Sequence, residues 1–305
     1  MKTTSGWNRL SLTRKEAIFG YIFILPWIIG FLVLRFIPMI ASLFLSFTEY
    51  NILTPPELTG AANFLKMFTD DPSFLDALKV TFTYAIFAIP IGMAISLAIA
   101  VLLNQKVPGV TAWRTIYYLP SVVSGVAVAT LWVWLFHSQF GLINLGLSLV
   151  GIQGPAWLGD PDWALAALII MSFWGIGGGM VINLAGLQGI PTELYEAASI
   201  DGANAWHRFW SVTIPMLSPV LFFNLVMGVI ETFQYFTNAY VMTDGGPGRS
   251  TLFYNLYLFQ NAFRYYKMGY ASALAWVMFL IILVLTLSIF KSSPYWVYYE
   301  GLRKR

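Results

Sequence analysis

Six apolar stretches, each long enough to cross a lipid bilayer, constrain this 305-residue chain more than any other feature. A transmembrane helix needs about 20 mostly apolar residues to cross roughly 30 Å of hydrocarbon. Only 10% of the residues are charged, whereas a soluble domain has about 25%. The sequence therefore predicts an all-α membrane protein with six transmembrane helices, at residues 17–34, 80–103, 115–136, 163–187, 211–230 and 268–290.

Two of the apolar stretches need comment. The fifth continues beyond residue 230 to about residue 243, with Glu231 as its one charge. A seventh stretch, residues 140–152, has thirteen residues and is rich in glycine. It is too short to span, so we expect an interfacial or re-entrant segment there.

The distribution of basic residues predicts the orientation. An even number of spans puts both termini on one side of the membrane, and that side carries eleven Lys and Arg residues against five opposite. The eleven are Lys2, Arg9, Arg14, Lys15, Lys106, Arg114, Arg208, Lys291, Arg303, Lys304 and Arg305, and the five are Lys66, Lys79, Arg249, Arg264 and Lys267. Because basic loops stay in the cytoplasm, we expect a multi-pass protein of the cytoplasmic membrane with both termini in the cytoplasm.

Composition excludes several kinds of site. The chain has no cysteine, so it has neither a thiolate nucleophile nor a cysteine-ligated metal. Its two histidines, His137 and His207, are few ligands for any other metal site. The net charge of +3 comes from basic residues beside apolar stretches, not from a stripe that could follow phosphates. We therefore expect no metal and no nucleic acid.

The segment between the fourth and fifth spans has a helix-turn-helix pattern. Pro191 and Glu193 suit the first turn of a helix, which we expect to run to about residue 200. Asp201 and Gly202 then provide a turn, because glycine tolerates the backbone conformation of a reversal. We expect a second amphipathic helix to follow and to end at Pro215. From physical chemistry alone, this segment is either a docking device or a solvated loop on the lipid surface.

A motif in this segment favours docking. The segment reads Glu196-Ala197-Ala198, three residues, Gly202, nine residues and Val212-Thr213-Ile214-Pro215. This pattern resembles the "EAA" loop of permease subunits of binding-protein-dependent ABC importers. The family pattern is Glu-Ala-Ala, three residues, Gly, nine residues, Ile-x-Leu-Pro, so Val212 and Ile214 are conservative departures. The sequences of residues 185–191, 201–204 and 243–251 look like those of the carbohydrate branch of these permeases, and of its MalF-like type in particular. The resemblance covers about residues 15–295.

The resemblance implies a role for six residues: Glu196, Ala197, Ala198, Asp201, Gly202 and Pro215. In such importers the loop forms a coupling helix that sits in a cleft of a cytoplasmic ATPase subunit. Carried over to this chain, Glu196 would make a polar contact with the ATPase, and the two alanines would form the close-packed face. The Asp201-Gly202 pair would make the turn, and Pro215 would pass the movement to the fifth span.

The resemblance also implies an organisation and a set of partners. We expect a cytoplasmic segment at 1–15, a first helix with its outer loop at 16–75, a type I importer transmembrane domain at 76–292 with its coupling loop at 188–215, and a cytoplasmic tail at 293–305. The implied partners are a MalG-like permease, two ABC ATPase subunits, an extracytoplasmic solute-binding protein, the lipid bilayer and a sugar-like solute. This chain would not be an enzyme and would hold no cofactor, because ATP and Mg belong to the ATPase.

A polar stripe marks the expected solute pathway. Asn224, Glu231, Gln234, Tyr235 and Asn238 fall at offsets that place them on one face of a continuous helix. A carboxylate within a span is costly unless it faces protein or water. Amide and carboxylate groups can take the hydrogen bonds of a hydroxyl-rich solute. The alternative is that these side chains bond to neighbouring helices or to the partner permease.

Small residues at four-residue spacing predict close helix packing. In the second span these are Gly92, Ser96 and Ala100, and in the fourth they are Gly175 and Gly179. Small side chains let helix backbones approach one another in a membrane.

Two other functions fit the sequence less well. An ion-coupled secondary transporter could also have six spans and an intramembrane carboxylate, but such proteins often carry inverted repeats, which we do not find. An intramembrane enzyme would need a catalytic constellation, and the chain has no His-Glu-x-x-His motif and no histidine near a candidate nucleophile. Residues 245–251 lack the lysine and the spacing of a phosphate-binding loop.

Overall fold

The structure, a computed structural model, describes residues 11–105 and 108–299. Within these ranges, six helical runs are long and apolar enough to cross a membrane, four of them directly and two as bent pairs. The direct spans are Leu12–Ser46, Pro72–Leu103, Ala205–Met242 and Met268–Trp296, and the bent pairs are Val110–Val122 with Gly125–Leu135 and Pro161–Gly175 with Gly177–Gln188. The predicted fold class and the six transmembrane helices are confirmed.

The first two spans are longer than predicted. The first consists of α1 (Leu12–Phe31), a π-helical turn η2 (Leu32–Phe36) and α2 (Ile37–Ser46). A small antiparallel hairpin follows, with two residues in each strand, β1 (Thr48–Glu49) and β2 (Glu57–Leu58). The short α3 (Ala62–Thr69) then leads to α4 (Pro72–Leu103). Asp71 caps α4, because its Oδ1 accepts hydrogen bonds from the backbone N–H groups of Ser73 and Phe74.

The third and fourth spans are bent, which hydropathy did not predict. α5 (Val110–Tyr118) and the 3₁₀ turn η3 (Leu119–Val122) meet α6 (Gly125–Leu135) at 98°. The short α7 (Leu142–Leu149) follows. α8 (Pro161–Ser172) with η4 (Phe173–Gly175) then meets α9 (Gly177–Gln188) at 46°. Proline in the first break and glycine in the second account for the bends, since both residues interrupt regular helical hydrogen bonding.

The segment after α9 contains the helices of the expected coupling loop. It begins with α10 (Thr192–Ile200), α11 (Ala205–Arg208), a π-helical turn η5 (Phe209–Thr213) and α12 (Ile214–Phe233). Beyond α12 lie α13 (Thr237–Met242), α14 (Tyr254–Phe259), the π-helical turn η6 (Gln260–Arg264) and α15 (Met268–Trp296).

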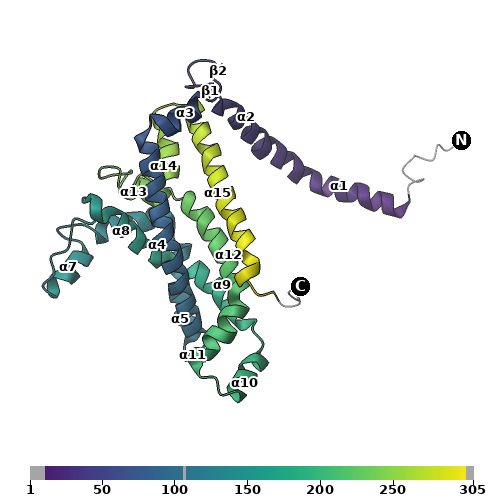
Figure 1. The fold of residues 1–305 in the computed structure, drawn as a ribbon, viewed down its shortest axis with the longest axis vertical. Helices are drawn as coiled ribbons and strands as arrows, with labels where there is room; N and C mark the ends of the chain where they lie inside the picture. The colour runs from purple at the N-terminus through teal and green to yellow at the C-terminus, as the bar shows by residue number, and fades with distance from the viewer. Residues whose placement is uncertain (1–10, 106–107, 300–305) are drawn as a thin grey trace.

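The helices cross the molecule in alternating directions between two sides (Figure 1). α10 and α11 lie at the bottom of the view, with the end of α15 above them and the start of α1 to the right, and we call this the coupling side. The hairpin, α3 and α14 lie at the top, with α13 below them and α7 at the left, and we call this the opposite side. The first and last spans therefore begin and end on one side, as an even number of crossings requires. Six of the basic residues used for the orientation, Lys2, Arg9, Lys106, Arg303, Lys304 and Arg305, are outside the described ranges.

Five helices form the packed body. α4 packs against α9 and α12, and α15 packs against α2 and α12. One apolar cluster, which includes Phe74, Leu168 and Tyr254, fills the body toward the opposite side. A second, which includes Met180 and Leu217, fills it toward the coupling side.

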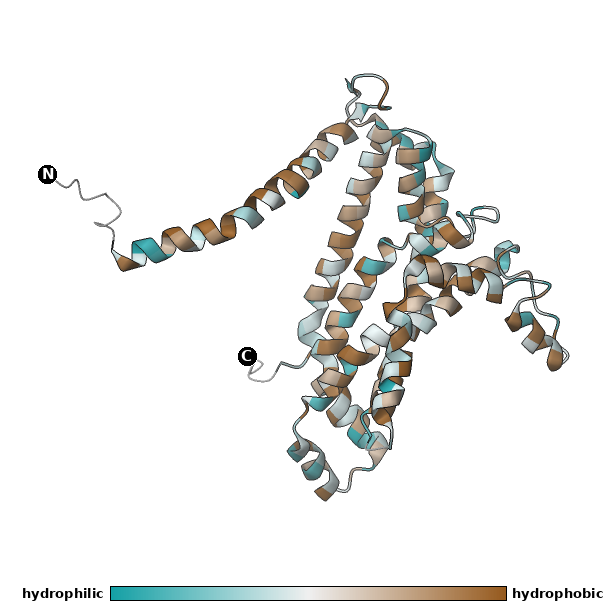
Figure 2. Ribbon diagram, turned by 180° about the vertical axis from the view of Figure 1, so that it is seen from behind, coloured by the Kyte–Doolittle hydropathy of each residue, from teal (hydrophilic) through white to brown (hydrophobic). Residues whose placement is uncertain are grey.

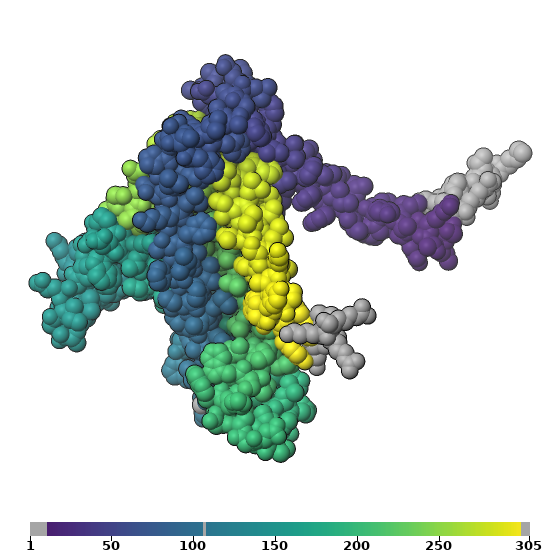
Figure 3. Space-filling model, in the orientation of Figure 1, coloured from purple at the N-terminus to yellow at the C-terminus, as the bar shows by residue number. Residues whose placement is uncertain are grey.

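α1 is not part of this body. It extends away from the other helices as a separate arm (Figures 1 and 3), and none of its residues is buried. Its surface is largely apolar (Figure 2). An apolar helix of this length is stable in lipid or against another membrane protein.

Candidate solute cavity and coupling loop

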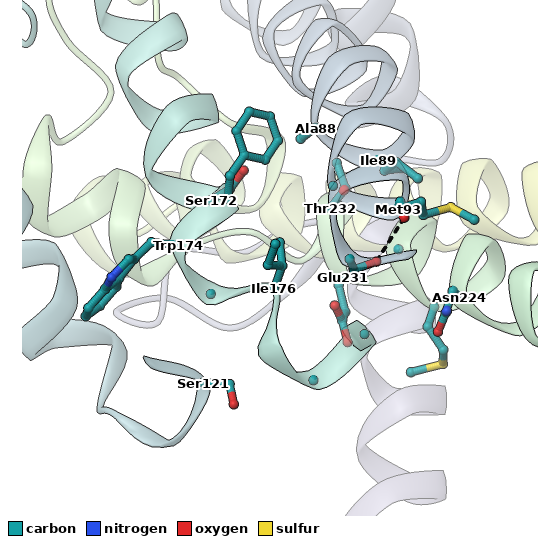
Figure 4. Close-up of a pocket in the computed structure, with 18 of the residues that line it drawn as sticks. Ala88, Ile89, Met93, Ser121, Ser172, Trp174, Ile176, Asn224, Glu231 and Thr232 are labelled. Atoms are coloured by element: carbon teal, nitrogen blue, oxygen red, sulfur yellow. Dashed lines mark hydrogen bonds between the residues drawn. The ribbon is translucent and has the colours of Figure 1, made fainter. Parts of the chain in front are cut away.

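A cavity of about 690 Å³ opens between α4 and α12 on one side and the bent third and fourth spans on the other. α4 and α12 form one wall, and η3, α6, η4 and α9 form the other. Figure 4 shows Met93, Asn224 and Glu231 on one side of the space, with Ser121 and Trp174 across from them. The two bends are what create this space, because a straight third or fourth span would pack along the body.

Glu231 gives the cavity its charge. It is the one Asp, Glu, Lys or Arg among the described residues that line the space. Its side chain is exposed to the cavity, and no Lys or Arg of the described ranges pairs with it. Most of the remaining lining is apolar or aromatic, with serine and amide groups between. A concave apolar site with a few polar groups is typical of small-molecule binding sites.

A chain of hydrogen bonds joins three helices beside the cavity. The Asn224 side-chain amide on α12 donates to Asn183 Oδ1 on α9 at 2.9 Å, and the Asn183 amide donates to Ser96 Oγ on α4 at 3.1 Å. Ser96 Oγ in turn donates to the Met93 carbonyl at 3.0 Å. Asn183 is fully buried, so each of these bonds replaces hydration that the group has lost. Asn224 thus has both predicted roles, since it lines the cavity and bonds a neighbouring helix.

Aromatic rings close the cavity toward the opposite side. The ring centroid of Tyr235 lies 4.8 Å from that of Tyr84 and 4.7 Å from that of Phe253. The Tyr235 hydroxyl and Asn238 Oδ1 are buried and complete no hydrogen bond of normal geometry with a described residue. Both residues line the cavity. The Tyr235 hydroxyl also interacts with the side chains of Asn238 and Tyr84, so a solute that bonds to these groups would replace part of that contact.

The predicted polar stripe is wrong in one respect. α12 ends at Phe233, and residues 234–236 are not helical before α13 begins. Asn224 and Glu231 reach the cavity from α12, whereas Tyr235 reaches it from this break and Asn238 from α13. Gln234 is exposed and does not line the cavity, and its carbonyl accepts a hydrogen bond from Asn255. The helical offsets failed because they assumed a continuous helix.

Sequence reasoning did not identify several polar residues of this region. Asn183 holds the helices together, and Tyr84, Ser121 and Ser172 line the cavity. Asn183 carried a usable signal, because an amide in the middle of an apolar span needs a partner. The serines and the tyrosine carried none, since their spans bend and the bends decide which faces meet.

The first half of the expected coupling loop has the predicted structure. α10 begins after Pro191, carries Glu193 in its first turn and ends at Ile200. Glu196 and Ala197 are exposed, and Ala198 is half-buried. Gly202 has φ +81°, which favours glycine because a side chain would clash in this left-handed region. Asp201 and Gly202 therefore form the predicted turn.

The second half differs from the prediction. α11, η5 and α12 form one continuous helix, and Pro215 lies in the first turn of α12 instead of ending a helix. The Ile214 N–H bonds to the carbonyl of Phe209, five residues earlier. A π-helical turn is wider than an α-helical one, so it accommodates a proline that would otherwise clash with the preceding turn.

Two side-chain contacts brace the loop against the span. The hydroxyl groups of Tyr195 and Thr213 lie 3.0 Å apart, and the Arg208 guanidinium donates to Ser199 Oγ at 2.9 Å. α10 is therefore tied to both η5 and α11. At the tip, Ile200 and Trp206 remain exposed, at 86% and 70%. The loop is held in place by these contacts and exposes apolar side chains, which is typical of a surface that binds another protein.

A second, polar cavity of about 510 Å³ lies on the opposite side. The hydroxyl groups of Tyr257 and Tyr270 both donate to Asp71 Oδ2, and Arg264 pairs with Asp244 at 2.9 Å. Burial raises the pKa of Tyr257, and its hydrogen bond to Asp71 raises it further. The Tyr257 hydroxyl therefore keeps its proton and remains a donor at neutral pH.

Comparison with known proteins then decides the family. Residues 72–292 match the family described as the inner membrane component of binding-protein-dependent transport systems. The chain belongs to this family. The matched range runs from the start of α4 nearly to the end of α15, so it includes the cavity and the coupling loop.

Individual relatives agree over nearly the whole chain. A probable ABC transporter permease protein, YesP of Bacillus subtilis strain 168, is 50% identical over 292 residues, which are 94% of each chain. The lactose transport system permease protein LacF of Rhizobium radiobacter is 36% identical over 94% of this chain and 96% of its own. Among solved structures, a chain of a bacterial alginate ABC transporter, in complex with an alginate-bound periplasmic protein, has a TM-score of 0.82 at 25% identity and covers 93% of this chain and 97% of its own.

These comparisons confirm the predicted resemblance to ABC importer permeases. This family member is a membrane component of a transport system, not its catalytic subunit. The roles of individual residues in coupling and in the solute pathway remain predictions.

Proposed function

We propose that this chain is the permease subunit of an ATP-driven importer that moves a sugar or sugar-like solute across the cytoplasmic membrane. One observation carries the proposal: α12 lines the cavity through Asn224 and Glu231 and continues without a break into α11 of the coupling loop. A movement of the loop therefore moves a wall of the cavity. The lactose permease among its relatives supports a saccharide as the solute.

The finer assembly follows from the same proposal. The partners would be a MalG-like permease, two ATPase subunits that use ATP and Mg, and an extracytoplasmic solute-binding protein. The coupling side, with both termini, would face the cytoplasm, as the count of basic residues predicts. Glu196, Ala197 and Ala198 would then meet the ATPase, Asp201 and Gly202 would keep the turn, and Pro215 would lie where the loop joins the span.

The cavity chemistry suits a hydroxyl-rich solute. The Glu231 carboxylate and Asn238 Oδ1 accept hydrogen bonds from hydroxyl groups, and the Tyr235 hydroxyl can donate one. A hydrogen bond to a charged group is worth about 1.5–3 kcal/mol. We therefore expect Glu231→Gln, which keeps the side-chain size but removes the charge, to reduce solute uptake about 10-fold or more, since 1.4 kcal/mol corresponds to a factor of ten.

The experiment uses the whole importer in liposomes, with labelled lactose and alginate oligosaccharides as neutral and acidic probes. ATP-dependent uptake that falls in Glu231→Gln but not in Gln234→Glu, the exposed neighbour, supports the proposal. Uptake that is unchanged in Glu231→Gln would argue against a solute contact. Uptake by this chain alone, driven by an ion gradient without ATP, would favour the secondary transporter.

A further inference from the structure

The connection between α6 and α8 is an uncharged projection with an exposed apolar face. No Asp, Glu, Lys or Arg occurs in residues 138–159. Within this range, α7 exposes Leu142, Leu145 and Leu149, which lie on one face because they are three and four residues apart. Leu149 is 82% exposed. Figure 2 shows α7 projecting from the body with much of its surface apolar.

This projection has a fixed orientation. The Asn144 side-chain amide donates to the carbonyls of Ser138 at 3.0 Å and Pro155 at 3.1 Å, and its oxygen accepts from the Trp157 indole at 2.6 Å. Ile143 and Leu147, on another face of α7, pack against the main apolar cluster. The exposed leucine face therefore points in a set direction instead of being free to fold back onto the body.

The position of α7 matches the surface of a membrane. It connects the ends of two spans, α6 and α8, and lies at the outer end of the projection that they form (Figure 1). The spans that it joins expose apolar side chains of their own, such as Trp134 on α6 and Trp163 on α8. The leucine face of α7 thus continues the surface that the adjoining spans present to lipid. Tryptophan is the residue typical of the boundary between lipid and water.

We propose that α7 is an in-plane anchor whose face of Leu142, Leu145 and Leu149 inserts into the outer leaflet of the bilayer. Apolar residues without nearby charge suit the boundary between headgroups and acyl chains. A soluble partner fits less well, because recognition between soluble proteins uses complementary charge for encounter and register. Since α7 connects α6 with α8, the anchor would hold the bent wall of the cavity at a constant depth.

The absence of native cysteine allows a direct test in the assembled importer. Leu145→Cys and Leu149→Cys carry a polarity-sensitive fluorophore. Ser148→Cys, at the flank of the leucine face about 60° from Leu145 and about 100° from Leu149, is the comparison position in the same helix. All three residues are exposed, so labelling leaves the core intact. The importer is reconstituted in phosphatidylcholine and phosphatidylglycerol vesicles. Quenching is measured with doxyl-labelled phosphatidylcholine from the lipid and with iodide from the water.

The anchor predicts a blue-shifted emission at 145 and 149, strong quenching by the doxyl lipid and loss of iodide quenching, with weaker doxyl quenching and stronger iodide quenching at the flanking position 148. Iodide quenching at 145 and 149 equal to that at 148 would overturn the proposal, because the face would then lie in water. Protection from both quenchers would also overturn it, in favour of a contact with the partner permease. Protection that depends on added binding protein would assign the face to that subunit instead.

Discussion

Gly177 offers a sharp test of how tightly the bent fourth span packs. A Cβ atom at Gly177 would lie 2.5 Å from the Tyr117 carbonyl oxygen and 2.8 Å from Tyr118 Cα. Carbon atoms normally pack about 3.5–4.0 Å apart, so the second contact is short by about 0.7 Å or more. Both neighbours are backbone atoms, which cannot rotate away. Gly177→Ala must therefore separate α9 from the end of α5.

The magnitude follows from this clash. Overpacking that shifts the backbone costs about 1–3 kcal/mol. At about 2–4 °C per kcal/mol for a large domain, the thermal midpoint should fall by about 2 °C or more. Gly178→Ala is the matched control, because its Cβ atom would meet nothing within 4 Å. Replacing a helical glycine there should be neutral or stabilise the protein by about 0.5–1 kcal/mol.

The assay is thermal unfolding of both variants in lipid nanodiscs, followed by tryptophan fluorescence. A lower midpoint for Gly177→Ala together with an unchanged or higher midpoint for Gly178→Ala is the expected result. Equal midpoints would refute the reasoning, since the close approach of α5 and α9 would then not limit the side chain at position 177.

Three further substitutions test other parts of the structure. Gly202→Ala forces an alanine into φ +81°, at a cost of about 1–2 kcal/mol, so co-purification with the ATPase and ATP-driven uptake should decrease; retention of both would remove the turn from the coupling role. Asn183→Ala leaves Asn224 and Ser96 without their shared partner and should cost about 1–3 kcal/mol, measured as a lower thermal midpoint; no change would mean that water replaces the amide. Asp71→Ala removes the cap of α4 and the acceptor of the Tyr257 and Tyr270 hydroxyl groups, so it should destabilise by about 0.5–2 kcal/mol or more, whereas Asp70→Ala, one residue away, should not; similar losses in both would contradict these roles of Asp71.

The spans could be predicted because each depends on local composition. Hydropathy located all six, and the turn at Gly202 followed from the residue type alone. Their ends were less predictable, since helices continue past the hydrocarbon wherever capping groups or packing support them. α4 begins at Pro72 because Asp71 caps it, eight residues before the predicted start of its span at residue 80.

The cavity was only partly predictable because it depends on contacts between distant helices. Gly179 approaches Ser96, as the small-residue spacing predicted. A Cβ atom added at Gly179 would lie 3.5 Å from Ser96 Oγ. Gly92 and Gly175 instead face open space, and Gly177 makes the closest approach of this region. Spacing identifies residues that share a helix face, but it does not say what that face meets. The bends decide this, and they depend on a few proline and glycine residues.

The π-helical turn η5 has a consequence for how motion passes through α12. A residue in an α-helix adds about 100° of rotation, so one extra residue in a wide turn offsets the faces above and below it by about that angle. The faces of α11 are therefore rotated relative to those of α12 from where a continuous α-helix would place them. Deleting one residue from η5 would turn α11 and α10 about the helix axis without changing the sequence of the cavity wall, so it would test the proposed docking role separately from the proposed solute contacts.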